Sequence, residues 1–289
     1  MTRDADSLKI AIQKSGRLSE DSLSLLKKCG IALDNRINKL SSKSYNFPLE
    51  VYFLRDDDIP QYVADGFADV GIVGENVFLE KNKKADIVKK LGFGKCRLSL
   101  AIPKDQNYSD LSFFQGKSIA TSYPYILKKF LEENSVNADL HEISGSVEIA
   151  PNIGLADAIC DLVSSGSTLF MNGLKEVEVV LKSESILIKN RKLDDVKTSL
   201  LNQLIFRIET VSNAAGYKYI LLNAPDEKLK NIINLLPGMK SPTIMPLADK
   251  AWSSVHTVIK EDDFWNIIEK LKTEGAEGIL VIPIEKMIL

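Results

Sequence analysis

The sequence predicts an α/β protein in which two lobes face one cleft and a ferredoxin-like domain follows. Three observations support this fold class. Before Ala214, short apolar runs alternate with amphipathic segments, which is the pattern of strands joined through helices. The pattern restarts near Lys95, where a new series of strands and helices marks a crossover between lobes. After Ala214 the order becomes βαββαβ, the ferredoxin-like arrangement.

The first lobe opens with two βα units. A strand begins at Leu8, and a K-S-G-R turn leads into an amphipathic helix over residues 21–29. A second strand, residues 49–55, precedes a helix, and residues 68–76 form a third strand with its turn. The three aspartates at 56–58 stand just before the second helix, where carboxylates favour the positive end of the helix dipole. Helix capping is therefore one explanation of this triplet, although a cap needs only one of its members.

The most informative segment is A-D-A-I-C-D-L-V-S-S-G-S-T-L, residues 156–169. Its residues 158–163 have the size of a buried parallel strand, and residues 169–177 predict a helix. The loop between them combines a glycine with small hydroxyl residues, so that backbone amides and hydroxyls can surround a phosphate. The candidate phosphate ligands are Ser164, Ser165, Gly166, Ser167 and Thr168.

Two aspartates, Asp157 and Asp161, accompany this loop. A carboxylate repels a bare phosphate, but it can bind the hydroxyls of a ribose or hold Mg²⁺ directly or through water. The segment therefore predicts a site for a phosphoribosyl group. An ordinary Ser/Gly turn with solvated aspartates is the alternative.

The strands of both lobes end in polar turns. Because ligands collect at the carboxyl ends of strands in open α/β sheets, we expect these turns to line one cleft. They comprise residues 14–17, Arg55, residues 69–75, residues 121–123, Glu148 and residues 161–168.

Composition narrows the classes of function. The chain has 289 residues, of which 45% are hydrophobic and 26% charged, a globular composition long enough for two or three domains. The net charge is -2 with lysine and arginine spread along the sequence, which argues against a nucleic-acid-binding surface. No signal-peptide core and no apolar run of transmembrane length is present, so we expect a cytoplasmic protein without a membrane partner.

Cysteine and histidine are too sparse for a metal cluster. Cys29, Cys96 and Cys160 lack C-x-x-C spacing, so neither a disulfide framework nor a zinc site is supported, and buried free thiols are expected. His141 and His256 are the only histidines, and each is expected to be exposed or hydrogen-bonded rather than part of a catalytic triad.

The C-terminal module has its own pattern. Its position suits a regulatory or assembly domain. The predicted strands and helices are residues 217–223, 226–235, 242–247, 253–259, 262–273 and 278–282.

Seven motifs taken in order closely resemble the long form of ATP phosphoribosyltransferase, the enzyme family that opens histidine biosynthesis. The resemblance covers nearly the whole chain. The motifs are A-I-Q-K-S-G-R-L, L-R-D-D-D-I-P, D-V-G-I-V-G-E-N, C-R-L-S-L-A-I-P, I-A-T-S-Y-P, G-S-V-E-I-A-P and L-A-D-A-I-C-D-L-V-S-S-G-S-T-L.

The resemblance implies a fold and its boundaries. The implied core has two α/β lobes arranged like a periplasmic binding protein, followed by a ferredoxin-like regulatory domain. The first catalytic lobe is expected to comprise residues 1–95 and 184–214, the second residues 96–183 with the phosphoribosyl loop, and the regulatory domain residues 215–289.

The resemblance also implies a reaction. N1 of the ATP adenine attacks C1 of 5-phosphoribosyl 1-diphosphate and displaces pyrophosphate, with Mg²⁺ as cofactor. This displacement depends on positioning and charge neutralisation, because the sugar becomes cation-like as pyrophosphate leaves. Two other functions stay open: a phosphoribosyltransferase for another base, and a two-lobed sensor that binds a small molecule without catalysis.

Site residues follow from the resemblance. Arg17 and Arg55 match arginines near the phosphates and are the candidate catalytic residues, with a surface ion pair as the alternative for each. The phosphoribosyl diphosphate is assigned to Asp157, Asp161 and the 164–168 loop, and the metal to Asp161 and Glu148, although Glu148 also suits a helix start. ATP is assigned to Arg17, Asp69, Gly71, Gly74, Glu75 and Tyr123; packing or turn roles would equally explain Tyr123 and the glycines.

The resemblance further implies feedback inhibition by histidine at the C-terminal module. The matching positions are Asn223, Met239, Thr243 and Gly278, and core or turn roles remain open for each. Some relatives have an acidic residue near Asn223 or Ala224, so the contact to the amino group of histidine is undefined. A homo-oligomer in a dimer and hexamer equilibrium is also implied.

Overall fold

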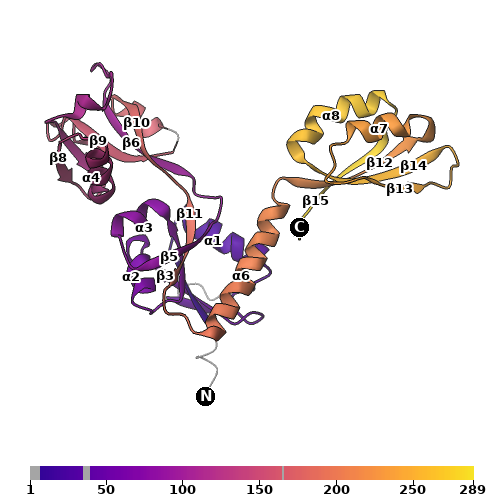
Figure 1. The fold of residues 1–289 in the computed structure, drawn as a ribbon, viewed down its shortest axis with the longest axis horizontal. Helices are drawn as coiled ribbons and strands as arrows, with labels where there is room; N and C mark the ends of the chain where they lie inside the picture. Colours follow the sequence, from indigo (N-terminus) through magenta and orange to yellow (C-terminus); the bar gives the residue numbers. More distant parts are fainter. Residues whose placement is uncertain (1–6, 35–39, 165) are drawn as a thin grey trace. The chain divides into compact units, whose positions relative to one another are not determined.

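The computed structural model describes residues 7–34, 40–164 and 166–289. The described residues form three β-sheets, which belong to the two lobes and the C-terminal domain (Figure 1). The predicted fold class is confirmed: two α/β lobes precede a βαββαβ domain.

The first lobe is a six-stranded sheet in the order β2-β3-β1-β4-β11-β5. Strands β1, β3 and β4 are parallel, while β11 runs antiparallel to both β4 and β5. The carboxyl ends of the three parallel strands therefore meet at one edge. The strands are β1 (Leu8–Gln13), β2 (Ser41–Lys43), β3 (Leu49–Leu54), β4 (Val70–Gly74), β5 (Ala85–Lys90) and β11 (Ser185–Asn190); the helices are α1 (Arg17–Lys28), η1 (Asp56–Asp58), α2 (Ile59–Ala64) and α3 (Glu75–Lys81).

The central strand β4 of this sheet is buried on both faces. Val70, Ile72 and Val73 of β4 are fully buried, as expected for an inner parallel strand. Gly71 lies among them because α2 packs directly against its Cα. A Cβ at this position would lie 2.7 Å from Cγ2 of Ile59 and 3.0 Å from Cγ2 of Val63.

The second lobe is a five-stranded sheet in the order β10-β6-β9-β7-β8. Strand β7 is parallel to β8 and β9, while β6 runs antiparallel to β9 and β10. Its core is built around Phe114, Leu100, Ile119 and Leu127, all fully buried. The elements are β6 (Cys96–Pro103), η2 (Leu111–Phe114), β7 (Ser118–Thr121), α4 (Pro124–Glu133), β8 (Asp139–Glu142), η3 (Val147–Ile149), β9 (Ala158–Val163), α5 (Ser167–Met171) and β10 (Leu174–Ser183).

The helix predicted over residues 169–177 is wrong in its extent. Helix α5 ends at Met171, and Leu174 already belongs to β10, where it pairs with Pro103. Gly173 has φ +71, a left-handed conformation that stops a helix. The next residues, K-E-V-E-V-V, alternate with period two, which is the pattern of a strand.

The chain crosses between the two sheets twice, and the crossings lie side by side. Residues 91–95 lead from β5 to β6, and a single residue, Glu184, separates β10 from β11. The amide of Leu91 donates to the carbonyl of Ser185 (2.9 Å), and the amide of Ser185 donates to the carbonyl of Phe93 (2.9 Å). A Cβ on Gly94 would lie 2.5 Å from Oγ of Ser185, so the close approach requires glycine.

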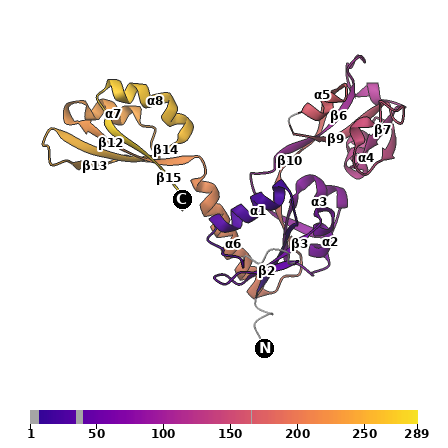
Figure 2. The ribbon, with the colours of Figure 1, turned by 180° about the vertical axis from the view of Figure 1, so that it is seen from behind.

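The C-terminal domain is a four-stranded antiparallel sheet in the order β13-β14-β12-β15. Helices α7 and α8 cover one face of this sheet (Figures 1 and 2). Ile220, Leu222 and Val255 from the sheet pack there against Ile232 and Phe264 from the helices. The elements are β12 (Tyr217–Pro225), η4 (Asp226–Lys228), α7 (Leu229–Leu235), β13 (Thr243–Pro246), β14 (Trp252–Lys260), α8 (Glu261–Thr273) and β15 (Glu277–Pro283).

Helix α6 (Asp195–Ala214) connects the catalytic lobes to this domain. The chain divides into two compact units between Asn202 and Gln203, inside α6, whereas the sequence places the domain boundary after residue 214. The boundaries drawn from the sequence therefore stay predictions. Among the described helices, none has the length and apolar character needed to cross a bilayer.

We predict that Gly71→Ala lowers the free energy of unfolding by about 1–3 kcal/mol, because the new methyl overlaps the α2 side chains in a packed core. Urea denaturation followed by circular dichroism measures the change. Ile59→Leu, which removes the Cγ2 methyl at equal volume, should recover part of the loss in the double variant. A Gly71→Ala protein as stable as the parent would contradict this packing.

Candidate active site

The two candidate catalytic arginines stand at the carboxyl edge of the first sheet. Arg17 begins α1 directly after Gly16, which has φ +90, and Arg55 follows β3. The amide of Lys14 donates to the carbonyl of Leu54 (2.8 Å), so the turns that carry the two arginines are adjacent. Both side chains are exposed, and neither forms an ion pair with another described residue. They are therefore available to a phosphate, and the alternative of a surface ion pair has no partner in the described parts.

The end of β4 is tied to the returning crossover. The amide of Asn76 donates to Oγ of Ser183 (3.0 Å), which in turn donates to Oδ1 of Asn76 (2.9 Å). Both side chains are buried. The amide of Glu75 donates to the carbonyl of Glu184 (2.9 Å). A Cβ on Gly74 would lie 2.5 Å from Oδ1 of Asn76, so this glycine makes room for the junction.

Tyr123 joins the two lobes. Its hydroxyl accepts a hydrogen bond from Nδ2 of Asn76 (3.1 Å), and burial is the main reason that the pKa of the phenol lies above its usual range. Helix α4 begins next to it, where both carboxylate oxygens of Glu80 from α3 accept the amides of Tyr125 (2.9 Å) and Ile126 (3.0 Å). A carboxylate from one lobe thus caps a helix of the other.

The aspartate triplet at 56–58 does not cap a helix through its side chains. No side-chain cap bond is formed at the start of η1 or α2. Asp56 is instead largely buried, and its Oδ1 has no hydrogen-bond partner. Burial, reinforced by the charge of Asp57, raises the pKa of Asp56 to about 6. A buried unpartnered carboxylate beside a cleft is typical of a functional site.

Asp161 and Glu148 lie close enough to influence each other. Burial is the main cause of the raised pKa of Asp161, and the charge of Glu148 raises it further; a hydrogen bond from the Leu162 amide (2.7 Å) opposes both. A cation between the two carboxylates would relieve this repulsion. Among the described residues no cluster of three or more carboxylate, histidine or cysteine side chains surrounds a metal position. Two carboxylates completed by substrate oxygens and water are a donor set that suits Mg²⁺.

The predicted phosphate loop follows β9. Gly166 adopts φ +80 and starts α5, and the hydroxyl residues Ser164, Ser167 and Thr168 are exposed. Nη1 of Arg97 donates to the carbonyl of Ser164 (3.3 Å), which holds the loop to the start of β6, just after the first crossing. Ser165 lies outside the described residues.

Three predicted site residues lie away from the strand ends that carry the other candidates, and their assignment stays a prediction. Asp157 precedes β9, at the opposite end from the phosphate loop, about 20 Å away for a six-residue strand. It accepts hydrogen bonds from the amide (2.9 Å) and hydroxyl (2.8 Å) of Ser118, which lower its pKa. Asp69 precedes β4, so it too lies at the far end of its strand. Gly71 is enclosed by α2.

Both carboxylate oxygens of Asp69 are engaged within the protein. It is buried, and its Oδ2 accepts the amide of Lys9 (2.8 Å) while Oδ1 pairs with Nζ of Lys197 (2.8 Å). A buried carboxylate with both oxygens occupied holds the start of α6 to the sheet. The sequence could not show this, because the partners are 60 and 128 residues away.

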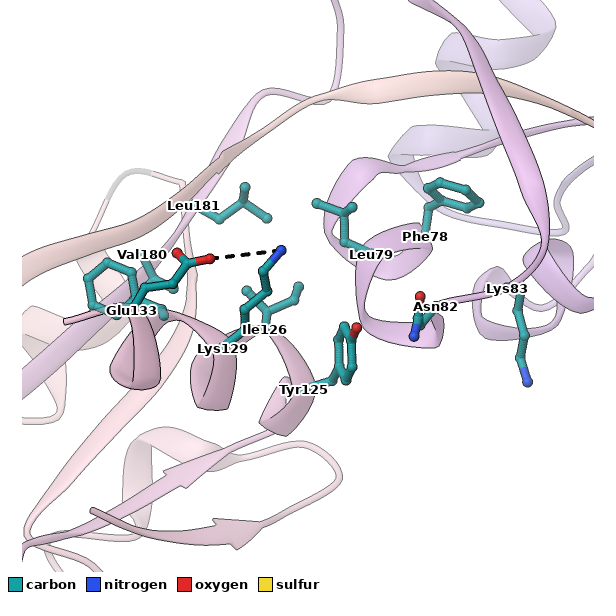
Figure 3. Close-up of a pocket in the computed structure, with 11 residues that line it drawn as sticks. Phe78, Leu79, Asn82, Lys83, Tyr125, Ile126, Lys129, Glu133, Val180 and Leu181 are labelled. Carbon is teal, nitrogen blue, oxygen red and sulfur yellow. Dashed lines mark ion pairs between the residues drawn. The ribbon is translucent and has the colours of Figure 1, made fainter. Parts of the chain in front are cut away.

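Two hollows lie near α3 and α4. A polar one of about 530 Å³ includes Tyr123, Ser122, Asp57 and Lys81. The other, of about 290 Å³, is lined mainly by apolar side chains of α3, α4 and β10, with the Lys129–Glu133 ion pair at its rim (Figure 3). None of the predicted site residues lines this second hollow, so the polar one is the better nucleotide candidate.

The predicted histidine-site residues are partly brought together. Asn223 and Gly278 are neighbours: a Cβ on Gly278, which has φ +58, would lie 3.0 Å from Nδ2 of Asn223. Thr243 pairs with His256, two positions further along β14 than the partner of Asn223. Met239 is exposed between α7 and β13. His256 is hydrogen-bonded by Tyr219 (2.7 Å) and Ser254 (3.0 Å), as expected.

The remaining candidates fare as follows. His141 is exposed, and Cys29 and Cys160 are buried, as expected, while Cys96 is only half-buried. Sequence reasoning missed Asn76, which stands inside the D-V-G-I-V-G-E-N motif, and the orphaned oxygen of Asp56. The sequence signal for Asp56 was the run of three aspartates at a helix start, where a single aspartate is enough for a cap.

Comparison with known proteins decides the family. The family model described as ATP phosphoribosyltransferase matches residues 55–210, and the model of its C-terminal domain matches residues 214–286. The chain is 61% identical over 282 residues to the ATP phosphoribosyltransferase of Phocaeicola vulgatus, covering 98% of this chain and 100% of that protein. The chain belongs to the ATP phosphoribosyltransferase family.

Other members of the family agree. The ATP phosphoribosyltransferase of Cytophaga hutchinsonii is 60% identical over 281 residues, covering 97% of this chain and 98% of the relative. The solved ATP phosphoribosyltransferase complex of HisG and HisZ from Thermotoga maritima is similar with a TM-score of 0.59 and 30% identity, covering 70% of this chain and 98% of that one. As a member of the ATP phosphoribosyltransferase family, the chain is an enzyme of the pentosyltransferase class.

We predict that Asp56→Asn stabilises the protein at neutral pH. A folded-state pKa of about 6, against an ordinary value of 3.8, means that the ionised carboxylate opposes folding above pH 6. The penalty disappears as the pH falls through 6 towards 4. The variant should therefore gain on the order of 1–2 kcal/mol at pH 7.5 and nothing below pH 4.

Melting temperatures of parent and variant between pH 4 and pH 8 provide the measurement. Asp58→Asn, an exposed neighbour on the same turn, is the matched control. A pH-independent difference, or an equal gain in the control, would show that Asp56 carries no burial penalty.

Proposed function

We propose that the chain transfers the 5-phosphoribosyl group of 5-phosphoribosyl 1-diphosphate to N1 of ATP in the cytoplasm, releasing pyrophosphate. The family supports the reaction class. The observation that carries the proposal is the combination of two arginines at one sheet edge, without ion pairs among the described residues, with a glycine- and hydroxyl-rich loop and two coupled carboxylates on the other lobe. This set suits a reaction between two phosphate-bearing substrates.

The phosphate loop is proposed to hold the donor. Exposed hydroxyls and backbone amides after Gly166 can donate hydrogen bonds to the 5-phosphate. Asp161 lies near the end of β9 that leads into this loop and is proposed to bind the ribose hydroxyls. As pyrophosphate departs, C1 gains positive character and the leaving oxygens gain negative charge. Arg17 and Arg55 can each bind two of those oxygens through a planar guanidinium.

The acceptor is proposed to lie against the first lobe. Gly74 and Glu75 at the end of β4, with the polar hollow beside Tyr123, provide a surface for the nucleotide. The hydroxyl of Tyr123 accepts a hydrogen bond from Asn76, so its proton would still be available to donate to the nucleotide, and its ring would offer a stacking surface. The lobes then exclude water from C1, which would otherwise compete with N1 for the sugar.

Mg²⁺ is proposed as the metal, held by Asp161 and Glu148 together with donor oxygens. It would supply positive charge to the diphosphate when bound. The two carboxylates orient the metal and compensate its charge, while the loop amides fix the sugar phosphate. We further propose that the enzyme forms homo-oligomers, dimers and hexamers, as the resemblance implies.

The activity is tested by incubating the purified chain with ATP, 5-phosphoribosyl 1-diphosphate and Mg²⁺ and identifying phosphoribosyl-ATP by mass spectrometry. Adenine in place of ATP is the control for base choice. Product only with another base, or no product with active substrates, would overturn the proposed reaction.

We predict that Asp161→Asn raises the KM for 5-phosphoribosyl 1-diphosphate about tenfold or more, because a charged hydrogen bond to the ribose or metal is lost. The KM for ATP should change much less. Asp157→Asn is the matched control, since the same substitution at the other end of β9 removes no donor contact. Steady-state kinetics with each substrate varied give the result. Equal effects of both substitutions would remove Asp161 from the donor site.

The C-terminal domain is proposed to bind histidine as a feedback inhibitor. The adjacent Asn223 and Gly278 support a binding role, because the glycine leaves the amide group of Asn223 uncovered by a side chain on the neighbouring strand. We predict that Gly278→Ala, which crowds that amide at a left-handed φ, raises the histidine concentration for half inhibition about tenfold.

Inhibition curves of the full chain measure this effect, with Lys272→Ala on the exposed side of α8 as the control. Unchanged inhibition in a folded Gly278→Ala protein would place histidine elsewhere. Absence of inhibition in the parent would refute the regulatory role altogether.

A further inference from the structure

A basic hollow of about 330 Å³ lies where the two crossovers meet. The arginines and carboxylates assigned above do not line it, although Ser164 of the phosphate loop does. Four of its residues are cationic and only one is a carboxylate. The lining residues are Lys90, Lys95, Cys96, Arg97, Ser164, Lys182, Ser183 and Glu184.

The strand register forces two of these cations together. Arg97 of β6 is the direct cross-strand partner of Lys182 of β10 in the antiparallel ladder. Like charges in directly opposite positions destabilise a sheet. An unfavourable pair of like charges is expected at functional sites, where binding of a ligand of opposite charge balances the repulsion.

Two of the four cations have protein partners. The guanidinium of Arg97 makes a two-pronged ion pair with the carboxylate of Glu176, which lowers the pKa of Glu176. Nζ of Lys90 pairs with Glu75 at 3.0 Å. The carboxylate of Glu184 accepts the amide of Gly92 (2.9 Å).

The other two cations are uncompensated. Lys95 and Lys182 are exposed, and neither has an ion-pair partner among the residues that the structure describes. The lone carboxylate of the lining, Glu184, keeps its negative charge when it accepts the amide, so the two lysines exceed it by one positive charge. The hollow therefore presents a surplus of positive charge to solvent.

The hollow is continuous with the donor loop. Ser164, the first residue of the phosphate loop, lines it, and Nη1 of Arg97 donates to the carbonyl of Ser164. An anion here would lie beside a sugar phosphate held by the loop. A chain of phosphates, with several charges along its length, matches two lysines that come from neighbouring segments.

We propose that this hollow binds a di- or triphosphate chain through Lys95 and Lys182, with Arg97 and Lys90 held by their carboxylates as its supporting frame. Under the proposed function, on which this step rests, the phosphate chain belongs either to the diphosphate of the donor or to the triphosphate of ATP. In the transfer, the C1–O bond breaks with its electron pair leaving on pyrophosphate while the C1–N1 bond forms. If the hollow binds the diphosphate of the donor, the lysines would neutralise the negative charge that develops on the leaving pyrophosphate. If it binds the triphosphate of ATP, they would hold the acceptor in place.

Isothermal titration of the full chain with inorganic pyrophosphate, and separately with tripolyphosphate, tests the site without requiring turnover. Lys182→Ala and Lys95→Ala should each weaken binding of at least one probe about tenfold. Lys182→Arg should retain binding, because the charge remains. Lys84→Ala, at the opposite end of β5 from Lys90, is the matched control and should bind like the parent.

No binding of either probe to the parent would overturn the proposal, as would equal weakening in Lys84→Ala, which would indicate a general charge effect. In steady-state kinetics, a raised KM for the donor in Lys182→Ala identifies the diphosphate, and a raised KM for ATP identifies the triphosphate. No change in either KM would overturn the site. A parent that binds pyrophosphate but makes no phosphoribosyl-ATP would refute the proposed reaction while leaving the subsite supported.

Discussion

The reciprocal hydrogen bonds between Asn76 and Ser183 are the constraint on which the catalytic core depends. They fasten the start of α3 in the first lobe to the last residue of the strand that returns from the second. Both side chains are buried, so neither can exchange its partner for water, and losing one would leave polar groups unsatisfied. The third hydrogen bond of Asn76, to Tyr123, extends the same junction to the cleft wall. The position of the end of β4, where the nucleotide is proposed to bind, therefore depends on the chain crossover.

The crossover region concentrates departures from ordinary local rules. Gly74 and Gly94 have no side chain because Asn76 and Ser185 occupy the space that a Cβ would need. Arg97 and Lys182 face each other across a ladder in spite of their like charge. Glu80 caps a helix that belongs to the other lobe. Such features lower local stability unless the surrounding structure or a ligand compensates, and they coincide here with the edge at which both substrates are proposed to bind.

Charge is segregated around the proposed reaction. Coupled carboxylates, Asp161 with Glu148, belong to the second lobe and are proposed to face the sugar, while Arg17 and Arg55, without an ion pair among the described residues, follow strands of the first sheet. Asp56 keeps one buried carboxylate oxygen without a hydrogen-bond partner among the described residues, and burial raises its pKa to about 6. An enzyme that must bring two phosphate-bearing molecules together needs both kinds of group, since the metal requires carboxylates and the phosphates require cations.

The sequence by itself determined the βα order, the ferredoxin-like module and the family, because these depend on local periodicity and on ordered motifs. It misjudged the segment after the loop, where Gly173 ends the helix and a strand begins. Only the tertiary structure placed Asp157 and Asp161 at opposite ends of β9 and paired Asp69 with Lys9 and Lys197, since a strand carries its two ends to opposite edges of a sheet. The register of β6 against β10 likewise placed Arg97 beside Lys182. No sequence pattern indicated this pairing, because the two residues are 85 positions apart in the chain. Periodicity in the sequence indicates which residues are buried. The partner of a charged side chain, and the sheet edge at which that side chain lies, depend instead on pairing between segments that are distant in the sequence.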